Sequence, residues 1–374
     1  MGEKDLAHRL LALSPDRPVG GQDVPAERAL RETLLRNTLA APSSRSVPEG
    51  SFEKRTSWRN TPTGLQRTVC AIGAFDGVHL GHRALIERAR EEADARGDEL
   101  AVVTFSPDPS VVLTPGRPQR LLLGDGDRMR TLESIEGVDR VVALDFTAEL
   151  AALPYERFVR ETLGGLMDLD VIVVGSDFSL GAGGAGTVGA LTELGRADGF
   201  EVVGMDLLDE GGSPVTATRI RGMLGEGRVE HAAGLLGRCH FVRGVVEHGR
   251  GEGTSFGFPT ANVRVFDGLC LPAEGVYAGY VACANTAWPA AINVGKPRSF
   301  SPGEEGAPFL EATLLGFEGD LYGAEVTAVF VRWLREPRLF SSLDELERVV
   351  LGNVSWVRDT LGERGVCLGG EVLA

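Results

Sequence analysis

Short apolar runs alternate with helical stretches between residues 67 and 237. The strand-like runs are VCAIGAF, ELAVVTF, VDRVVALDF and LDVIVVGSDF, and the helical ones include RALIERAREEADARG and PYERFVRETLGGLM. Near-continuous apolar strands separated by helices are typical of a parallel sheet covered by helices on both faces. The pattern therefore predicts an α/β domain over residues 67–237.

From residue 238 the helical alternation stops. The runs FVRGVV, GVYAGYVAC, AAINVG, FLEATLLGF and EVTAVFVRW are strand-like and are separated by turns rich in Gly and Pro. Several short strands of this kind predict a compact antiparallel barrel over residues 238–363. A helix closes the domain, with Ser342 as its expected N-cap and Glu345 at capping-box spacing. Residues 364–374 are expected to be a short C-terminal tail.

Residues 1–66 show neither pattern. Leucines at helical spacing predict one helix over residues 25–40. The stretches APSSRSVPEG and RNTPTG that follow are rich in Pro, Ser, Thr and Gly, as flexible linkers are. We interpret residues 1–66 as an N-terminal extension, and a frayed tail without function is the alternative.

Composition limits the classes of protein that fit these patterns. A chain of 374 residues is expected to hold two or three domains, and 43% hydrophobic with 24% charged residues excludes global disorder. No apolar run approaches the roughly 18–20 residues that span a bilayer. The net charge of −15 argues against a general nucleic-acid or anionic-membrane surface. The only lysines are Lys4, Lys54 and Lys296, so a phosphate site must rely on Arg, His, backbone N–H groups or a metal ion.

The cysteines and the N-terminus predict a cytoplasmic protein. The five cysteines are scattered, odd in number and lack a C-x-x-C pair, which is typical of reduced thiols. The N-terminus has no apolar core of a signal peptide, and its acidic residues argue against a transit peptide. We expect small-molecule partners, with no nucleic acid and no membrane, and the sequence leaves the oligomeric state open.

The stretch GAFDGVHLGH at residues 73–82 is the first candidate site. It follows a predicted strand and opens a predicted helix, whose N-terminal N–H groups suit an anion. His79 and His82 are three residues apart, hence on one helical face, where two imidazoles could stabilise charge at a phosphorus atom. A zinc site lacks a nearby Cys or third His, and two incidental histidines remain an alternative. The candidate nucleotide contacts are Gly73, Phe75, Asp76, Gly77 and Gly81.

The stretch FGFPTAN at residues 256–262 is the second candidate site. Thr260 and Asn262 offer oxygen ligands of the hard type that Mg²⁺ accepts beside substrate phosphates. A Gly-rich loop precedes them and could wrap a phosphate with backbone N–H groups. Because there is no Walker A motif, this is not a P-loop kinase, and an ordinary turn is the alternative interpretation. The candidate loop glycines are Gly249, Gly251, Gly253 and Gly257.

The first motif resembles the N-terminal domain of the bifunctional riboflavin kinase/FAD synthetase family, which belongs to the HxGH nucleotidyltransferases. Two more segments follow in the expected order. VGSDFSLG (174–181) resembles the flavin-side loop, in which Asp177 would be the polar contact and Phe178 an apolar wall. TATRIR (216–221) resembles the segment that contacts nucleotide phosphates in the family. It implies contacts from Thr218, Arg219 and Arg221.

The second motif resembles the flavokinase domain of the same family. P-T-A-N at residues 259–262 is followed by G-V-Y-A at 275–278, E-A-T-L-L at 311–315 and G-D-L-Y-G at 319–323. The resemblance makes Glu311 the general base that accepts the proton of the riboflavin 5′-hydroxyl. In a strand, Glu311 and Thr313 would share one face, opposite Leu310 and Ala312.

The resemblance implies a Rossmann-like HxGH nucleotidyltransferase domain followed by an antiparallel β-barrel flavokinase domain with a C-terminal helix. It implies phosphorylation of riboflavin to FMN by ATP, and adenylylation of FMN to FAD with release of pyrophosphate. Mg²⁺ would be the cofactor, ATP the co-substrate, and riboflavin, FMN and FAD the substrates and products. His79, His82 and Arg221 would serve the second reaction, in which positioning and charge neutralisation matter most.

Several positions depart from the family pattern. In the first domain Ala217 replaces a serine, Asp108 stands in F-x-P-H-P where His is usual, and Leu180 stands where an aromatic is usual. An acid near polyphosphate is expected to be unfavourable. The run GAGGAG (181–186) lacks the usual basic residue, and we interpret it as a mobile glycine loop. In the second domain the departures are Glu252, Thr254 and Thr313.

These departures leave three hypotheses. The first is a bifunctional enzyme that makes FMN and then FAD. The second is an enzyme with one active half, most naturally the kinase, or one that acts on a flavin analogue or with another nucleotide. The third is a flavin- or nucleotide-binding regulatory protein without catalysis.

Overall fold

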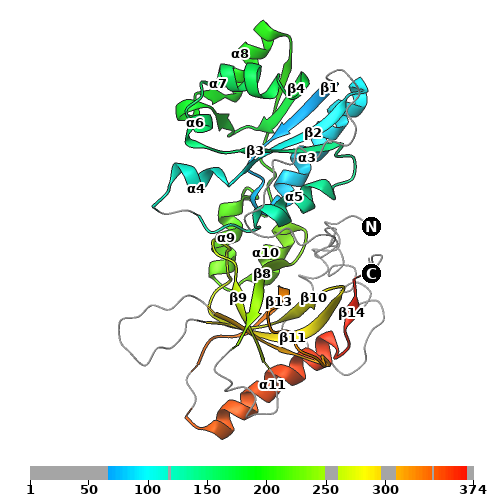
Figure 1. Ribbon diagram of the computed structural model, residues 1–374, viewed down its shortest axis with the longest axis vertical. Coiled ribbons are helices and arrows are strands. Elements are labelled where there is room, and N and C mark those ends of the chain that lie inside the picture. Colours follow the sequence, from blue (N-terminus) through cyan, green and yellow to red (C-terminus); the bar gives the residue numbers. More distant parts are fainter. Residues whose placement is uncertain (1–65, 117–118, 249–259, 296–308, 339–340, 369–374) are drawn as a thin grey trace. The chain divides into compact units, whose positions relative to one another are not determined.

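The computed structural model describes residues 66–116, 119–248, 260–295, 309–338 and 341–368 (Figure 1). The expected helix over 25–40 lies outside the described residues, as does the extension apart from Gln66. The described chain divides into two compact units, residues 66–217 and residues 218–368, which we call the sheet unit and the barrel unit. The domain boundary expected after residue 237 stays a prediction.

The sheet unit is built on five parallel strands in the order β3-β2-β1-β4-β7. The strands are β1 (Arg67–Ile72), β2 (Glu99–Ser106), β3 (Arg140–Asp145), β4 (Asp168–Gly175) and β7 (Glu201–Met205). Consecutive buried residues fill the central strands, because both faces of the sheet are covered. The predicted parallel sheet is confirmed.

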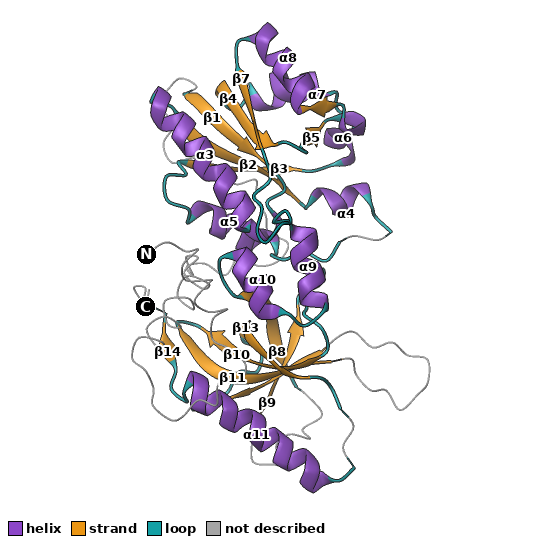
Figure 2. Ribbon diagram, turned by 180° about the vertical axis from the view of Figure 1, so that it is seen from behind, coloured by secondary structure: helices purple, strands orange, loops and turns teal. Residues whose placement is uncertain are grey.

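Helices cover both faces of this sheet (Figure 2). On one face, helix α3 packs through Leu85, Ile86 and Ala89. On the other, the apolar core includes Phe158 and Leu191. The helical segments of the unit are η1 (Asp76–Val78), α3 (Leu80–Arg96), α4 (Pro109–Leu113), α5 (Asp125–Glu133), α6 (Ala148–Ala151), α7 (Tyr155–Arg157), the π-helical η2 (Phe158–Leu163), η3 (Ala182–Gly184) and α8 (Val188–Asp198).

Two local features of this unit add detail to the expectations. The helix expected from PYERFVRETLGGLM runs without a break over residues 155–163, as one α-helical turn (α7) followed by the π-helical η2, and it ends at the poor helix formers Gly164 and Gly165. The run GAGGAG belongs to a hairpin, in which β5 (Ser179–Leu180) pairs with β6 (Gly186–Thr187). Gly181 is required there, because it has φ 75° and an added Cβ would lie 2.7 Å from the backbone nitrogen of Tyr155.

The barrel unit is a closed antiparallel barrel. Its strands follow the order β10-β13-β8-β9-β12-β11, and β11 pairs back with β10. They are β8 (His240–Glu247), β9 (Thr260–Val265), β10 (Gly275–Cys283), β11 (Thr286–Gly295), β12 (Phe309–Leu314) and β13 (Glu325–Arg335), with a short β14 (Val366–Cys367) beside β11. Helices α9 (Ala217–Gly225) and α10 (Val229–Leu236) precede the barrel. The predicted barrel is confirmed.

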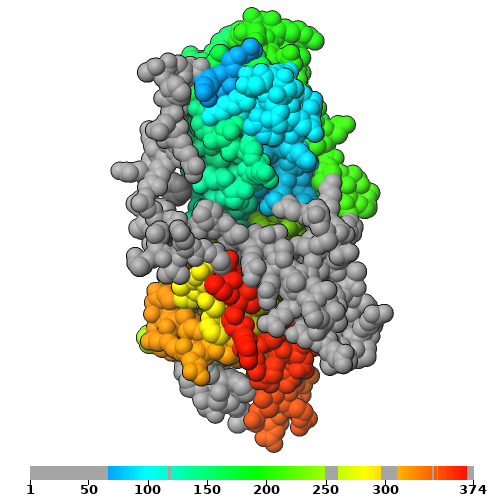
Figure 3. Space-filling view, turned by 90° about the vertical axis from the view of Figure 1, so that its right-hand side faces the viewer, coloured from blue at the N-terminus to red at the C-terminus, as the bar shows by residue number. Residues whose placement is uncertain are grey.

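Helix α11 (Leu343–Leu361) closes the barrel unit as expected, and it lies at the surface of that unit (Figure 3). The side chain of Ser342 accepts a hydrogen bond from the backbone N–H of Glu345 at 3.2 Å, so the predicted N-cap is confirmed. Val354 and Val357 of the helix pack against Ala278 of the barrel. The sequence pattern therefore predicted the start of α11, and the structure adds its buried face.

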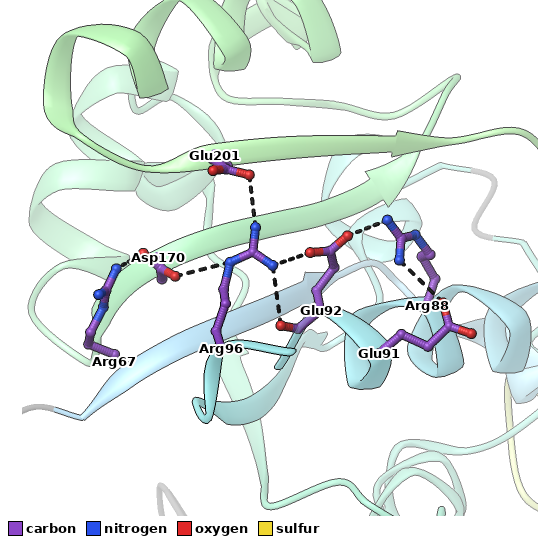
Figure 4. A network of polar contacts seen from close by, with 7 residues as sticks. All are labelled: Arg67, Arg88, Glu91, Glu92, Arg96, Asp170 and Glu201. Atoms are coloured by element: carbon purple, nitrogen blue, oxygen red, sulfur yellow. Dashed lines mark hydrogen bonds and ion pairs between the residues drawn. The ribbon is translucent and has the colours of Figure 1, made fainter. Parts of the chain in front are cut away.

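A network of ion pairs lies at the amino ends of the parallel strands, where α3 ends (Figure 4). Arg96 approaches Asp170 of β4 at 3.3 Å and Glu201 of β7 at 2.9 Å, and it also pairs with Glu92. Such partly exposed pairs contribute about 0–1 kcal/mol each. The four carboxylates of this network lie at the amino ends of the strands, opposite the GAFDGVHLGH turn at their carboxyl ends. Its other members are Arg67, Arg88 and Glu91.

Two candidate active sites

The glycine-rich turn 73–82 follows the central strand β1 at its carboxyl end. Strand β1 lies between β2 and β4, where the order of strands reverses, and open α/β sheets bind their ligands at that point. The N–H of Gly73 donates to the carbonyl of Val103 on β2 at 3.1 Å. Phe75 is buried with φ 53°, and Gly77 has φ 79°. These constraints fix the turn at the switch point of the sheet.

Asp76 has a structural role within this turn. Its buried side chain accepts hydrogen bonds from the backbone N–H groups of Leu122 (2.8 Å) and Leu123 (3.3 Å). The carboxylate therefore ties the turn to the segment that precedes α5. Its contact with a nucleotide stays a prediction.

The two histidines of the motif stack on one another. Their ring centroids lie 3.6 Å apart with the planes inclined by 18°, and Phe75 meets His82 edge-on at 5.2 Å. His79 caps α3, because its Nδ1 accepts a hydrogen bond from the N–H of His82 at 3.4 Å. Gly81 allows this stack: a Cβ there would lie 3.2 Å from the His79 ring and 3.1 Å from the carbonyl oxygen of Val215. The structure thus brings the two predicted histidines together.

His82 is an uncharged imidazole at neutral pH. Burial lowers the pKa of His82 well below its usual 6.5, and the neighbouring His79 and Arg128 side chains lower it further. Its Nδ1 is buried and makes no hydrogen bond among the described residues. A buried polar atom without a partner is costly, and the contact of this nitrogen with a nucleotide phosphate stays a prediction.

Asp108, which we expected to be unfavourable near polyphosphate, is held inside the protein. Its Oδ1 accepts hydrogen bonds from the N–H (2.9 Å) and hydroxyl (2.7 Å) of Ser110, and it thereby caps α4. Its Oδ2 lies 3.5 Å from Nη1 of the buried Arg128. The negative charge at this position therefore has a positive partner that the motif did not reveal.

The expected flavin-side loop follows β4, the strand beside β1. Asp177 is exposed, while Phe178 packs against the core of the sheet unit. Leu180 is buried at 9% exposure, so this departure contributes to the core. The glycine-rich turn 73–82, which we call the histidine turn, and this loop therefore follow neighbouring parallel strands at their carboxyl ends and lie side by side.

The expected phosphate contacts of TATRIR lie at the start of α9. Thr218 is exposed, Arg219 and Arg221 are half-buried, and Nη2 of Arg221 lies 3.5 Å from the hydroxyl of Thr218. These three residues belong to the barrel unit, whereas His79 and His82 belong to the sheet unit. That all five residues act on one nucleotide therefore stays a prediction. The departure Ala217 is the first residue of α9.

The second candidate site lies on adjacent strands of the barrel. The hydroxyl of Thr260 donates a hydrogen bond to Oε1 of Glu311 at 2.6 Å. Asn262 is directly opposite Glu311 in the β9–β12 register, and Thr313 is opposite Thr260. Directly opposed residues point to the same face, so these side chains converge. The expected alternation holds, since Leu310 and Ala312 are fully buried and Glu311 is half-buried.

The oxygen donors at this site suit Mg²⁺. The hydroxyl of Thr260, the amide oxygen of Asn262 and the carboxylate of Glu311 are hard ligands, which Mg²⁺ accepts together with substrate phosphates. Among the described residues there is no cluster of three His, Cys, Asp or Glu side chains of the kind that forms an all-protein metal site. The expected glycines Gly249, Gly251, Gly253 and Gly257, and the departures Glu252 and Thr254, lie outside the described residues.

Two further residues near these sites lie outside every motif that the sequence shows. Arg128 on α5 lies behind the histidine turn, far along the chain from residues 73–82. Asn293 on β11 is directly opposite Glu311, on the side away from Asn262. Only the fold reveals these positions, because neither residue stands at a characteristic spacing from a motif.

The comparisons with known proteins cover both halves of the chain. A family model for FAD synthetase matches residues 61–219, and a model for riboflavin kinase matches residues 236–361. The bifunctional riboflavin kinase/FMN adenylyltransferase of Pseudomonas fluorescens is 35% identical over 78% of this chain and 92% of its own length. The enzymes of the same name from Bacillus subtilis and Escherichia coli are 33% and 32% identical, over 75% and 79% of this chain and 88% and 93% of their own lengths.

A solved structure supports the fold. The crystal structure titled macrolide-efflux protein from Streptococcus pneumoniae is 28% identical and matches with a TM-score of 0.71, covering 82% of this chain and 97% of that one. Of the helices in the described ranges, none combines the length and apolar character needed to cross a membrane. The chain is a transferase with an FAD synthetase part and a riboflavin kinase part, and it belongs to the bifunctional riboflavin kinase/FMN adenylyltransferase family.

Proposed function

We propose that this chain phosphorylates riboflavin to FMN with ATP in its barrel unit and adenylylates FMN to FAD with a second ATP at the histidine turn. The observation that carries the proposal is the placement of each motif's reactive side chains. His79 and His82 stack at the switch point of the sheet, and Thr260 bonds Glu311 at 2.6 Å in the barrel.

In the kinase reaction Glu311 is the general base. Its carboxylate accepts the proton of the riboflavin 5′-hydroxyl while that oxygen bonds to the γ-phosphorus of ATP, and ADP leaves. The hydrogen bond from Thr260 orients the carboxylate, and the buried neighbours of Glu311 in β12 fix its strand. Thr260 and Asn262 would hold Mg²⁺, which neutralises phosphate charge when bound.

In the adenylyltransferase reaction an FMN phosphate oxygen bonds to the α-phosphorus of ATP, and the bond to pyrophosphate breaks. Because Nδ1 of His79 accepts a hydrogen bond, a neutral His79 ring carries its proton on Nε2, which makes that nitrogen a donor. His79 and His82 would hydrogen-bond the phosphates as charge develops, and Arg221 would add a fixed positive charge. Thr218 and Arg219 would bind the same phosphates.

The remaining assignments extend this proposal. The glycines of residues 73–81 and the glycines preceding Thr260 would approach the phosphates through backbone N–H groups. Asp177 and Phe178 would contact the flavin from the carboxyl end of β4, next to the histidine turn. We further propose a cytoplasmic enzyme with small-molecule partners, adenylyltransferase and kinase domains over residues 67–237 and 238–363, and no nucleic-acid or membrane partner.

Product analysis tests the proposed function. The purified chain is incubated with Mg²⁺, riboflavin or FMN, and ATP or CTP, and the flavins are resolved by chromatography. Formation of FMN and FAD with ATP supports the proposal. FMN without FAD would leave only the kinase, a preference for CTP would reassign the nucleotide, and flavin binding without turnover would indicate a regulatory protein.

A further inference from the structure

Arg128 is a charged residue with no exposure to solvent. Its guanidinium Nη2 donates to the carbonyl of Phe105 and to Oδ1 of Asp125, the latter at 2.8 Å. Its Nη1 lies 3.5 Å from Oδ2 of Asp108, and within the described part of the chain neither Nη1 nor Nε makes a hydrogen bond. A fully buried arginine is costly unless it is paired. An apolar side chain would fill this position at lower cost, so the arginine indicates a role other than packing.

The partners of Arg128 define one piece of backbone at the carboxyl end of β2. Phe105 and Asp108 belong to residues 105–110, which run from the end of β2 to the start of α4 and which we call the turn 105–110. Asp108 also binds both polar groups of Ser110. The second oxygen of Asp125 accepts a hydrogen bond from the hydroxyl of Ser106 at 2.6 Å. The turn 105–110 is therefore fastened to α5 at three points, all through Arg128 or its ion-pair partner.

The same guanidinium acts electrostatically on the histidine turn. Among the charged groups of neighbouring elements, His79 from the same turn and Arg128 from α5 lower the pKa of His82, after burial itself. Asp108 and Asp125 face Arg128 as its counter-charges. Asp76, the acid within the histidine turn, is directed to the backbone of residues 122–123. Helix α5, which carries Arg128, contacts η1 within the histidine turn, so the buried guanidinium lies in an element packed against that turn.

We propose that Arg128 is a positioning residue of the adenylyltransferase site, which fixes the turn 105–110 through Asp108, Asp125 and the Phe105 carbonyl and holds a permanent positive charge beside His82. This inference rests on the proposed role of His82 in FAD formation. It assigns Asp108 a defined task, namely to balance and orient the buried arginine. Arg128 itself does not touch substrate.

The test is the pH dependence of FAD formation in variants of the full chain, with FMN formation by the same preparation as the control for folding. Arg128→Met removes the positive charge, so the pKa of His82 rises. The acid limb of kcat/KM should then move up by about one pH unit, and kcat should fall about tenfold or more. Arg128→Lys keeps the positive charge but lacks the forked guanidinium. The acid limb of kcat/KM should therefore stay near its wild-type position, and kcat should fall less than it does in Arg128→Met.

Asp108→Asn is the matched variant, because it retains an acceptor for Ser110 and leaves Arg128 charged. We expect a severalfold loss of kcat with no upward shift of the acid limb. The proposal is overturned if Arg128→Met leaves the limb in place, if Arg128→Lys shifts it as much as Arg128→Met does, or if Asp108→Asn raises it. Should Arg128→Met fail to fold, Arg128→Gln takes its place: it keeps hydrogen-bond donors but has no charge, so the same upward shift of the acid limb is expected, and an unmoved limb overturns the proposal.

A direct titration separates this inference from the proposed function. The NMR signal of the His82 ring is followed against pH in the full chain without substrate, and a His82→Gln variant assigns it. A higher pKa in Arg128→Met than in the wild type supports the inference even if the wild type makes no FAD. An unchanged pKa overturns it even if FAD is formed.

Discussion

The histidine turn and the Thr260–Glu311 pair both bring reactive side chains together, but the first does so within one short segment and the second between two strands that are distant in sequence. The turn uses residues within ten positions of one another, held by a left-handed Phe75, by Gly81 and by an N-cap. The barrel pair joins residues 51 positions apart through strand register. A local site depends on turn conformation, whereas a register-built site depends on the whole sheet.

The two sites also differ in how charge is handled. Burial, with lesser contributions from His79 and Arg128, lowers the pKa of His82 and keeps its ring neutral, whereas Glu311 is half-buried and receives a hydroxyl hydrogen bond. Substitutions at either site should consequently affect one reaction only.

The largest effect is expected from Glu311→Gln. The amide cannot accept the proton of the riboflavin 5′-hydroxyl, so FMN formation should fall about 10²–10⁴-fold. FAD formation from supplied FMN should be unchanged. FMN and FAD formation are assayed separately to check this. Thr313→Ser, on the same strand face as Glu311, is the matched control. Loss of both activities, or of neither, contradicts the assignment of Glu311.

His82→Ala should produce the reciprocal result. Loss of a hydrogen-bonding group aimed at developing phosphate charge should lower FAD formation about 10²–10³-fold, while kinase activity persists. Steady-state rates with FMN and ATP, followed by flavin chromatography, measure this effect. A drop in the kinase rate as well would show that the turn stabilises the whole chain and is not specific to one site.

His240 provides a buried imidazole in the barrel for comparison with His82. It donates from Nε2 to the carbonyl of Cys270 at 2.7 Å, and burial lowers its pKa to about 4. Because the folded pKa lies below the unfolded value near 6.5, stability is complete above pH 6.5 and declines as the pH falls toward 4. The loss by pH 4 should be about 3 kcal/mol.

Denaturant unfolding at pH 7 and pH 4, monitored by barrel tryptophan fluorescence, measures this loss. His240→Phe cannot titrate, so its stability should fall by about 3 kcal/mol less than that of the wild type over the same interval. Equal losses in the two proteins would exclude His240 as the acid-sensitive group.

Gly81→Ala should have the smallest effect on activity. Its Cβ would lie 3.2 Å from the His79 ring and 3.1 Å from the Val215 carbonyl, so the stack must shift by a few tenths of an ångström. We expect FAD formation to fall about tenfold, since small misplacements of reacting groups are costly. Gly189→Ala in α8, where nothing lies closer than 4.0 Å, is the control and should keep full activity.

The sequence predicted those features of the fold that depend on residues close together in the chain. The parallel sheet follows from near-continuous apolar strands that alternate with helices, and the barrel follows from short strands separated by turns. The cap at Ser342 follows from capping-box spacing, and the alternation around Glu311 follows from the period of two in a strand. Arg128 could not be found in this way, because its importance arises from partners at positions 105, 108 and 125 that only the fold assembles. For the same reason Asp108 appeared unfavourable, although it caps α4 and pairs with a buried cation.

A mixing experiment tests the central claim, that one chain holds two chemically separate sites, most directly. Glu311→Gln and His82→Ala are each incubated with riboflavin, ATP and Mg²⁺, alone and together, and FAD is quantified by chromatography. Each variant alone should form FAD at no more than about 1% of the wild-type rate, and the mixture should form it far faster, because FMN released by His82→Ala is the substrate of Glu311→Gln. FAD formed by either single variant as fast as by the mixture, or a mixture no faster than the single variants, would contradict the account.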